Sequence, residues 1–156
     1  MHRLPSLYIS HGSPMTALRP GEVGPRLADL AAALPRPRAI IMASAHWLSA
    51  QPFVGAHPMP PTVHDFGGFP APLYDLQYPA PGAPELAAEV RQRLQQASLP
   101  SQLDETRGLD HGAWVPLRFL FPDASIPVVP LSLQPHLGPM HQLALDNLAA
   151  FYAGKP

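Results

Sequence analysis

The chain contains no cysteine, and this absence excludes two kinds of chemistry. Without cysteine there is neither a disulfide framework nor a thiolate that could act as nucleophile or metal ligand. Charge is also scarce, since only 13% of the residues are charged, the net charge is −1 and no basic run occurs. This composition argues against nucleic acid or an anionic membrane surface as the main partner.

Long apolar runs are missing as well. No stretch approaches the roughly 18 to 20 residues that span a bilayer. The N-terminus lacks the basic region and apolar segment of a secretory signal, so we expect a soluble, cytoplasmic protein. The sequence also lacks a Gly-x-Gly-x-x-Gly loop, a Walker-type loop and a Gly-x-Ser-x-Gly elbow, and nucleotide-binding and serine-hydrolase interpretations therefore have no support.

Proline, in contrast, is abundant. The 156 residues include 23 prolines and 11 glycines. The combined share of proline and glycine stays just below the roughly 25–30% that is typical of disordered chains. The prolines also lie between apolar segments with clear periodicity. The length suits one domain with a real core, so we predict a single loop-rich domain over residues 1–156.

Hydrophobic periodicity predicts alternating strands and helices. Strands are expected at Leu4–Ser10, Ala39–Ala45, Pro52–Gly55 and Ile126–Leu133, with a weaker return to the sheet over Ser98–Arg107. Helices are expected at Glu22–Leu34, Pro84–Ala97, Ala113–Phe121 and Pro139–Tyr152. The proline-rich segment His57–Pro84 is expected to be a stiff functional loop. This order predicts an α/β fold with a central, mostly parallel or mixed sheet flanked by helices.

Three of these strands define the expected topology. Ala39–Ala45 shows no alternation, which is typical of a strand buried on both faces. Together with Leu4–Ser10 and the helix between them, it predicts a right-handed βαβ unit with parallel strands. Ile126–Leu133 contains Pro127 and Pro130, so we expect it to be an edge strand or to be bulged.

His11 and His46 each follow the carboxyl end of one of the two paired strands. Ligands of open α/β sheets gather at that edge. A lone histidine there more often hydrogen-bonds a carbonyl, but two at matching strand ends favour a metal site, because a divalent metal needs neutral imidazoles from rigid elements. The residues alone predict a mononuclear metal site with these two ligands placed and a third unplaced.

Two further histidines are candidate site residues. His64, beside Asp65, either helps to enclose a flat ring or lies in an Asx-type turn with Phe66 and Phe69 packed inward. His111 precedes a helix, whose N-terminal field favours the neutral imidazole that a base or a hydrogen-bond donor to substrate requires. The alternative for the turn around His111 is that it only caps the helix.

Six short motifs follow one another in a fixed order along the chain. They are His11–Met15, Ser44–Trp47, His64–Pro70, Tyr78–Gly82, Gly108–Trp114 and Ile126–Val129. In this order they resemble the class III extradiol ring-cleavage dioxygenases, in particular the DOPA 4,5-dioxygenase-like branch. The likeness runs from about Leu4 to Leu133, which is far more specific than one short pattern.

The resemblance implies the LigB-like extradiol dioxygenase fold and a non-haem metal, Fe(II) in active enzymes and Zn(II) in some members. It implies an enzyme that opens a catechol ring with O₂ next to its two hydroxyls. By position, His11 and His46 match the first two metal ligands of the family. His111 and His64 match pocket histidines that would face the substrate and take part in catalysis.

Aromatic residues beside these histidines would form the substrate pocket. Trp47, Phe66 and Phe69 would stack against the catechol and exclude water, and Ser13 is also expected to contact the substrate. Trp47 can equally be a core anchor.

Members of the family are substantially longer than this chain, and their later half supplies a further histidine and the last metal ligand. His136 and His141 lie in the wrong context for those roles, and Pro130 stands where the family strand usually has a polar residue. We therefore expect a partial catalytic domain that lacks the C-terminal part of the fold and whose activity is impaired unless another chain completes the site. A homo-oligomer is left open.

Two alternatives to the dioxygenase interpretation also remain open. The chain can be a non-catalytic metal-binding or interaction module that kept the fold, or a zinc-dependent hydrolase on a related scaffold.

Overall fold

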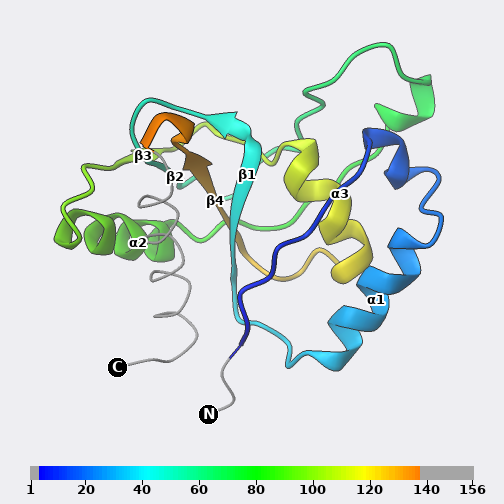
Figure 1. The fold of residues 1–156 in the computed structure, drawn as a ribbon, viewed down its shortest axis with the longest axis horizontal. Helices are drawn as coiled ribbons and strands as arrows, with labels where there is room; N and C mark the ends of the chain where they lie inside the picture. Colours follow the sequence, from blue (N-terminus) through cyan, green and yellow to red (C-terminus); the bar gives the residue numbers. More distant parts are fainter. Residues whose placement is uncertain (1–3, 138–156) are drawn as a thin grey trace.

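The computed structural model describes residues 4–137 as a mixed four-stranded sheet flanked by helices (Figure 1). The strands are β1 (Ile40–Leu48), β2 (Phe53–Gly55), β3 (Gln102–Asp104) and β4 (Val128–Leu133). The α-helices are α1 (Val23–Ala33), α2 (Pro84–Gln96) and α3 (His111–Leu120). Short 3-10 helices are η1 (Pro14–Ala17), η2 (Ala71–Leu73) and η3 (Pro135–Leu137). The expected α/β class with a mixed sheet is confirmed.

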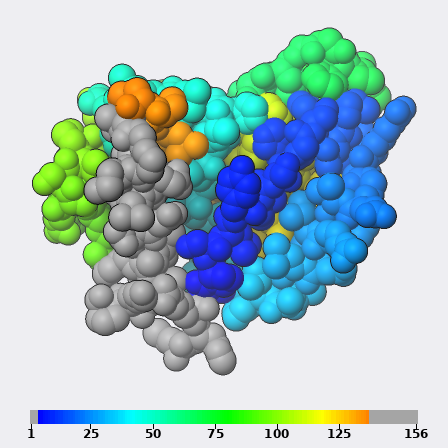
Figure 2. All heavy atoms as spheres, viewed as in Figure 1, coloured from blue at the N-terminus to red at the C-terminus, as the bar shows by residue number. Residues whose placement is uncertain are grey.

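The strand order is β1-β4-β2-β3, with β4 parallel to β1 and antiparallel to β2, and β2 parallel to β3. Helices α1 and α3 lie on one side of the sheet and α2 on the other (Figure 1). The N-terminal segment and α1 cover much of α3 on the face that Figure 2 shows. Two hydrophobic clusters, one against each face of the sheet, hold these layers together.

β4 is the strand that is buried on both faces. Val128 packs into the cluster around α1 and α3, whereas Val129 and Leu131 pack against α2, because successive side chains of a strand point to opposite faces. The expectation that Ile126–Leu133 is an edge strand is therefore wrong. The strand is central because its apolar residues fill both clusters, and this outweighs the cost of its proline.

Pro130 fits into this central strand for two structural reasons. Pairing between β2 and β4 is limited to Val54 and Leu131, so few ladder hydrogen bonds are required on that side. Gly55 also leaves room for the proline ring, since a Cβ at Gly55 would lie 2.4 Å from Cγ of Pro130. The irregularity that the sequence suggested is present in the sheet, but it belongs to β1.

β1 is an edge strand of the sheet formed by the described residues, and only Ser44 and Trp47 in it are buried. Ile40 and Met42 pack against the cluster around α1 and α3, and Ile41 packs against the cluster around α2, but all three are only half-buried. The prediction that Ala39–Ala45 contacts the core on both faces is therefore confirmed, whereas full burial of the strand is not, because an edge strand has a neighbouring strand on one side only.

The expected strand Leu4–Ser10 is also wrong for the described residues. This segment has no strand assignment there, and Tyr8 is fully exposed. The predicted βαβ unit is therefore not formed as two paired strands. A strand needs a partner for its backbone groups, and periodicity within a segment does not reveal whether that partner is available.

The remaining elements follow the predictions closely. α1 and α2 fall within one residue of Glu22–Leu34 and Pro84–Ala97, and both short strands, β2 and β3, lie in the expected segments. The segment between β2 and α2 holds only η2 and one isolated bridge, as expected of a long functional loop. The predicted helix Pro139–Tyr152 lies outside the described residues.

α3 begins two residues earlier than the predicted start at Ala113. Asp110 has extended backbone angles, and its carboxylate accepts a hydrogen bond from the amide of Ala113, so Asp110 is the N-cap. His111 is therefore the first residue of the helix, and Pro116 lies beyond the first turn rather than within it. None of the helices between residues 4 and 137 is long and apolar enough to cross a membrane.

Candidate metal and catalytic site

Three histidines from separate parts of the chain converge on one point. His11 ends the N-terminal segment, His46 lies in β1 and His111 opens α3, and their candidate ligand atoms all lie within 4.8 Å of one another. The Nε2 atoms of His11 and His46 are 2.9 Å apart, and the ring centroids of His46 and His111 are 4.0 Å apart. The structure thus brings His11 and His46 together although the predicted strand before His11 is not formed.

The protonation state of His11 suits a metal ligand. Burial lowers the pKa of His11, and the neighbouring His111 and His46 lower this pKa further, so the ring is neutral at neutral pH. When both rings are neutral, the facing Nε2 atoms of His11 and His46 can share at most one proton. Within residues 4–137, the buried Nδ1 of His11 also has no hydrogen-bond partner. A neutral imidazole with an unused nitrogen atom suits a ligand of a divalent transition metal.

A bulge in β1 determines where His46 lies. Ala43 pairs with Leu131 and Leu48 with Leu133, so the intervening residues 44–47 leave the regular ladder with β4. His46 therefore does not lie at the simple carboxyl end of a strand, as the sequence suggested, but in an irregular segment before that end.

Hydrogen bonds to α3 hold this bulge in place. Oγ of Ser44 accepts from the amide of His46 at 3.2 Å and donates to Oδ1 of Asp110 at 2.6 Å. Gly112 permits this close approach, because a Cβ there would lie 2.6 Å from Oγ of Ser44 and 2.7 Å from Cδ2 of His46. The first turn of α3 and the bulge that carries His46 therefore form one unit.

Arg107 extends this unit away from the histidines. Its Nη2 donates to Oδ2 of the buried Asp110 at 2.7 Å, and its guanidinium lies 4.9 Å from the ring centroid of Trp47. Trp47 is buried and also packs against Phe53, with 6.5 Å between the ring centroids. These contacts match the core-anchor alternative for Trp47 and do not bring it to the three histidines.

Asp65 binds His111 through two hydrogen bonds. Its Oδ1 accepts from the backbone amide of His111 at 2.9 Å and lies 2.8 Å from Nδ1 of the same residue. Burial raises the pKa of Asp65, but the hydrogen bonds from His111 outweigh it, so the net pKa is lowered and the carboxylate is ionised. From the sequence, Asp65 is only a neighbour of His64, because no local pattern indicates its partner on a distant helix.

An aromatic cluster adjoins the three histidines. Phe66 packs edge-on against His111, with ring centroids 5.6 Å apart, and Phe69 packs against Phe66 at 5.4 Å. The ring of His64 also packs against Phe66, 5.7 Å from its centroid, and its Nε2 is 2.9 Å from the carbonyl oxygen of Leu76. The structure therefore places Phe66 against His111, and Phe69 and His64 against Phe66.

Ser13 has a local structural contact. Its Oγ accepts from the amide of Met15 at 3.2 Å and caps η1. The hydroxyl is thus used two residues after His11 to start the turn that follows this histidine.

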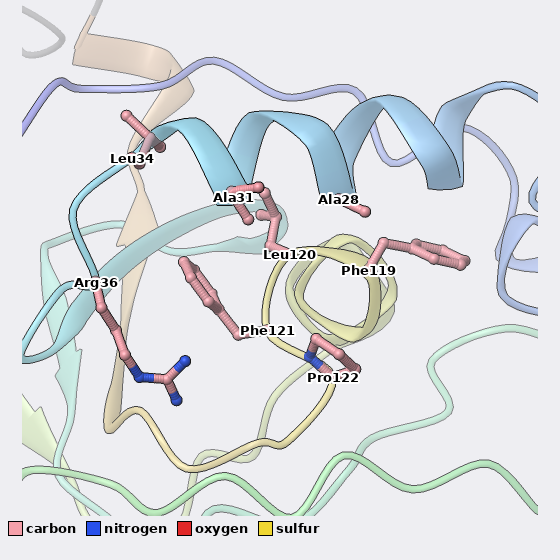
Figure 3. Close-up of a pocket in the computed structure, with 9 residues that line it drawn as sticks. Ala28, Ala31, Leu34, Arg36, Phe119, Leu120, Phe121 and Pro122 are labelled. Atoms are coloured by element: carbon pink, nitrogen blue, oxygen red, sulfur yellow. The ribbon is translucent and has the colours of Figure 1, made fainter.

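Two hollows of the structure are not lined by the three histidines. One of about 300 Å³ lies between α1 and the C-terminal end of α3, where Figure 3 shows Leu34, Arg36 and Phe121 around it. His111 is at the opposite end of α3, about 15 Å away for a helix of this length. A second hollow, of about 420 Å³, lies between the N-terminal segment and α1. The chemistry of the histidines, rather than hollow volume, identifies the site.

Comparisons with known proteins identify the family of the chain. The family model described as the catalytic LigB subunit of aromatic ring-opening dioxygenase matches residues 6–145. The 4,5-DOPA dioxygenase extradiol of Escherichia coli is 48% identical over 132 residues, covering 84% of this chain and 48% of its own length. The 4,5-DOPA dioxygenase extradiol of Beta vulgaris is 41% identical over 149 residues, which cover 93% of this chain and 56% of that protein.

A solved structure is similar in fold to this chain. The crystal structure of an uncharacterised Escherichia coli protein superposes with a TM-score of 0.55 at 38% identity, over 70% of this chain and 39% of that protein. The chain therefore spans about half the length of the curated relatives it matches.

Proposed function

The chain belongs to the family of the catalytic LigB subunit of aromatic ring-opening dioxygenases, and we propose that it is an extradiol dioxygenase that opens a catechol ring with O₂. The observation that carries this proposal is the convergence of His11, His46 and His111, which all lie within the matched residues. The names of the relatives favour a catechol of the DOPA type as substrate. Residues 1–156 are proposed to act as one partial catalytic domain.

The proposed metal ligands are His11 and His46. Fe(II) is the metal expected for ring opening, and Zn(II) is the alternative. When bound, such a metal supplies positive charge that lowers the pKa of the catechol hydroxyls and, as iron, the redox capacity that O₂ chemistry requires. The chain's part is to present neutral imidazoles from elements that Ser44 and Asp110 hold together.

We propose that His111 transfers the proton of a catechol hydroxyl. Its Nδ1 is occupied by Asp65, so Nε2 is the nitrogen left for the substrate. A neutral imidazole can accept a proton from a catechol hydroxyl and return it during oxygen insertion. The competing role is that Nε2 of His111 is a third metal ligand. The two roles differ in one result, since a ligand variant loses metal whereas a base variant keeps metal and loses turnover.

Phe66 and Phe69 are proposed to form the wall against which the catechol ring stacks. The position of Phe66 next to His111 supports this role, because an aromatic wall beside the proton-transfer group orients a flat substrate and excludes water. His64 packs against Phe66, and we propose that its part in catalysis is to support this wall. Substrate contacts of Trp47 and Ser13, the cytoplasmic location and a homo-oligomer stay predictions.

Oxygen uptake tests the proposed activity. The purified chain is loaded with Fe(II) without air and then mixed with air-saturated DOPA, while O₂ uptake and the yellow ring-opened product are followed. We expect uptake that matches product, and loss of both in the His11→Ala and His46→Ala variants. Metal binding without O₂ uptake or product would contradict the enzyme proposal for this chain and leave a metal-binding module.

A further inference from the structure

Asp65 has contacts that point to a role which the motif around it does not indicate. We propose that Asp65 is a positioning residue that holds His111 in the tautomer protonated on Nδ1, so that Nε2 carries a lone pair. This inference rests on the proposed function for its purpose, because either proposed role of His111, as base or as third ligand, requires an unprotonated Nε2.

The geometry restrains the whole side chain of His111. One carboxylate oxygen of Asp65 accepts two hydrogen bonds from His111, one from the backbone amide at 2.9 Å and one from Nδ1 at 2.8 Å. Two donors from one residue define the position of the acceptor relative to the backbone and to the ring, so they limit rotation about both side-chain torsions. The ring of His111 is also buried, with 7% of its side chain exposed, which leaves little room for another orientation.

The helix start stabilises Asp65 in this position. His111 is the first residue of α3, and the amides of a first turn have no partner within the helix. A carboxylate at this end meets both an unsatisfied amide and the positive end of the helix dipole. Asp110 caps the same turn through the amide of Ala113, so the two acids bind different donors and do not compete.

The chemistry of the acceptor determines the tautomer. An ionised carboxylate only accepts hydrogen bonds, so Nδ1 must carry the hydrogen of this contact. A neutral imidazole has one N–H, and Nε2 is then unprotonated. Phe66, edge-on to the ring at 5.6 Å between centroids, offers no acceptor that would favour a proton on Nε2. Carboxylates have the same effect on histidines that bind metals.

Nitrogen chemical shifts of the metal-free chain test the tautomer directly. Long-range proton–nitrogen correlation spectra of the ¹⁵N-labelled protein, recorded above the range where histidines protonate, distinguish N–H from lone-pair nitrogen for each ring. The His111→Gln variant assigns the signals. We expect His111 to show a protonated Nδ1 and an unprotonated Nε2. A protonated Nε2 in the wild-type chain would overturn the inference.

Three variants separate positioning from general damage. Asp65→Ala is expected to give a mixture of tautomers, whereas Asp65→Asn keeps an acceptor oxygen and is expected to restore the Nδ1–H form. Asp104→Asn, at the last residue of β3, is the matched control and should leave His111 unchanged. If Asp65→Ala keeps the wild-type tautomer in a folded protein, Asp65 does not position this ring.

Zinc titration adds a readout that does not depend on turnover. If His111 binds metal, we expect Asp65→Ala to weaken zinc affinity by about 10- to 100-fold, and Asp65→Asn by much less. An unchanged affinity together with a changed tautomer assigns Asp65 to the base role of His111. An inactive wild-type chain with the expected tautomer would contradict the proposed function but not the role of Asp65, so the two failures are distinguishable.

Discussion

The hydroxyl of Ser44 donates a 2.6 Å hydrogen bond to the carboxylate of Asp110, and this contact joins the bulge of β1 to the first turn of α3. Asp110 is 2% exposed and also binds Arg107. One buried acid thus links the segment that carries His46 to the helix that begins with His111. The site depends on this link because His46 lies on one side of it and His111 on the other.

Ser44→Ala should destabilise the chain and loosen the site. The change leaves Oδ1 of the buried Asp110 with only the longer hydrogen bond from the amide of Ala113, and it removes the acceptor of the His46 amide. We expect a cost of about 1–3 kcal/mol of unfolding free energy. Urea unfolding followed by tryptophan fluorescence measures this cost. Ser6→Ala, which alters an exposed hydroxyl, should have no effect. Equal unfolding midpoints for the two variants would show that the hydrogen bond does not join the elements.

Gly112→Ala should disturb the site more than the addition of a single methyl group suggests. The added methyl would lie within 3 Å of both Ser44 and His46, so one of them must move. We expect a loss of about 1–3 kcal/mol of unfolding free energy and weaker zinc binding. Gly67→Ala is the matched control, because a Cβ at Gly67 meets nothing within 4 Å. Zinc affinity that is unchanged in Gly112→Ala would contradict the close packing of His46 against α3.

Metal affinity should depend on the paired histidines. His11→Ala and His46→Ala each remove one proposed ligand, and we expect either change to lower zinc affinity by at least about tenfold, since the loss of a residue that only hydrogen-bonds a ligand already has such an effect. Affinity should rise with pH, because a metal binds the neutral imidazole. Calorimetric titration of the metal-free chain measures both effects. His57→Ala serves as the control, since Nδ1 of His57 accepts from the amide of Met59 instead.

Tyr78 should make the fold sensitive to alkali. Burial, and then the charge of Asp123, raise the pKa of Tyr78 to about 12, and its hydroxyl donates to the carbonyl oxygen of Phe121. Because this pKa is higher in the folded chain than the usual value near 10, the stabilisation is complete below about pH 10 and is lost as the pH rises towards 12.

Unfolding curves between pH 8 and pH 12 test this dependence. Tyr78→Phe should lower stability by about 1 kcal/mol at neutral pH and reduce the loss at high pH, because no buried phenol then ionises. Tyr8→Phe changes a fully exposed ring and should match the wild-type curve. An alkaline loss that persists unchanged in Tyr78→Phe would assign it to another group.

The helices α1 and α2 could be predicted from the sequence because their signals are local. Apolar residues recur at helical spacing, and a proline in the first turn of α2 needs no amide partner. The positions of the strands in the sheet were harder to predict from the sequence. The expected edge strand is the centre of the sheet, and the expected buried strand is its edge, because the neighbours of a strand come from distant parts of the chain.

The sequence by itself determined that His11, His46 and His111 are candidates for a metal and catalytic site, since three histidines in ordered motifs have no common packing role. Only the tertiary structure decided how they meet. The bulge in β1, the Ser44–Asp110 hydrogen bond and the Asp65 contacts to His111 join segments dozens of residues apart. Such contacts depend on where the chain returns in space, and local residue patterns do not record this.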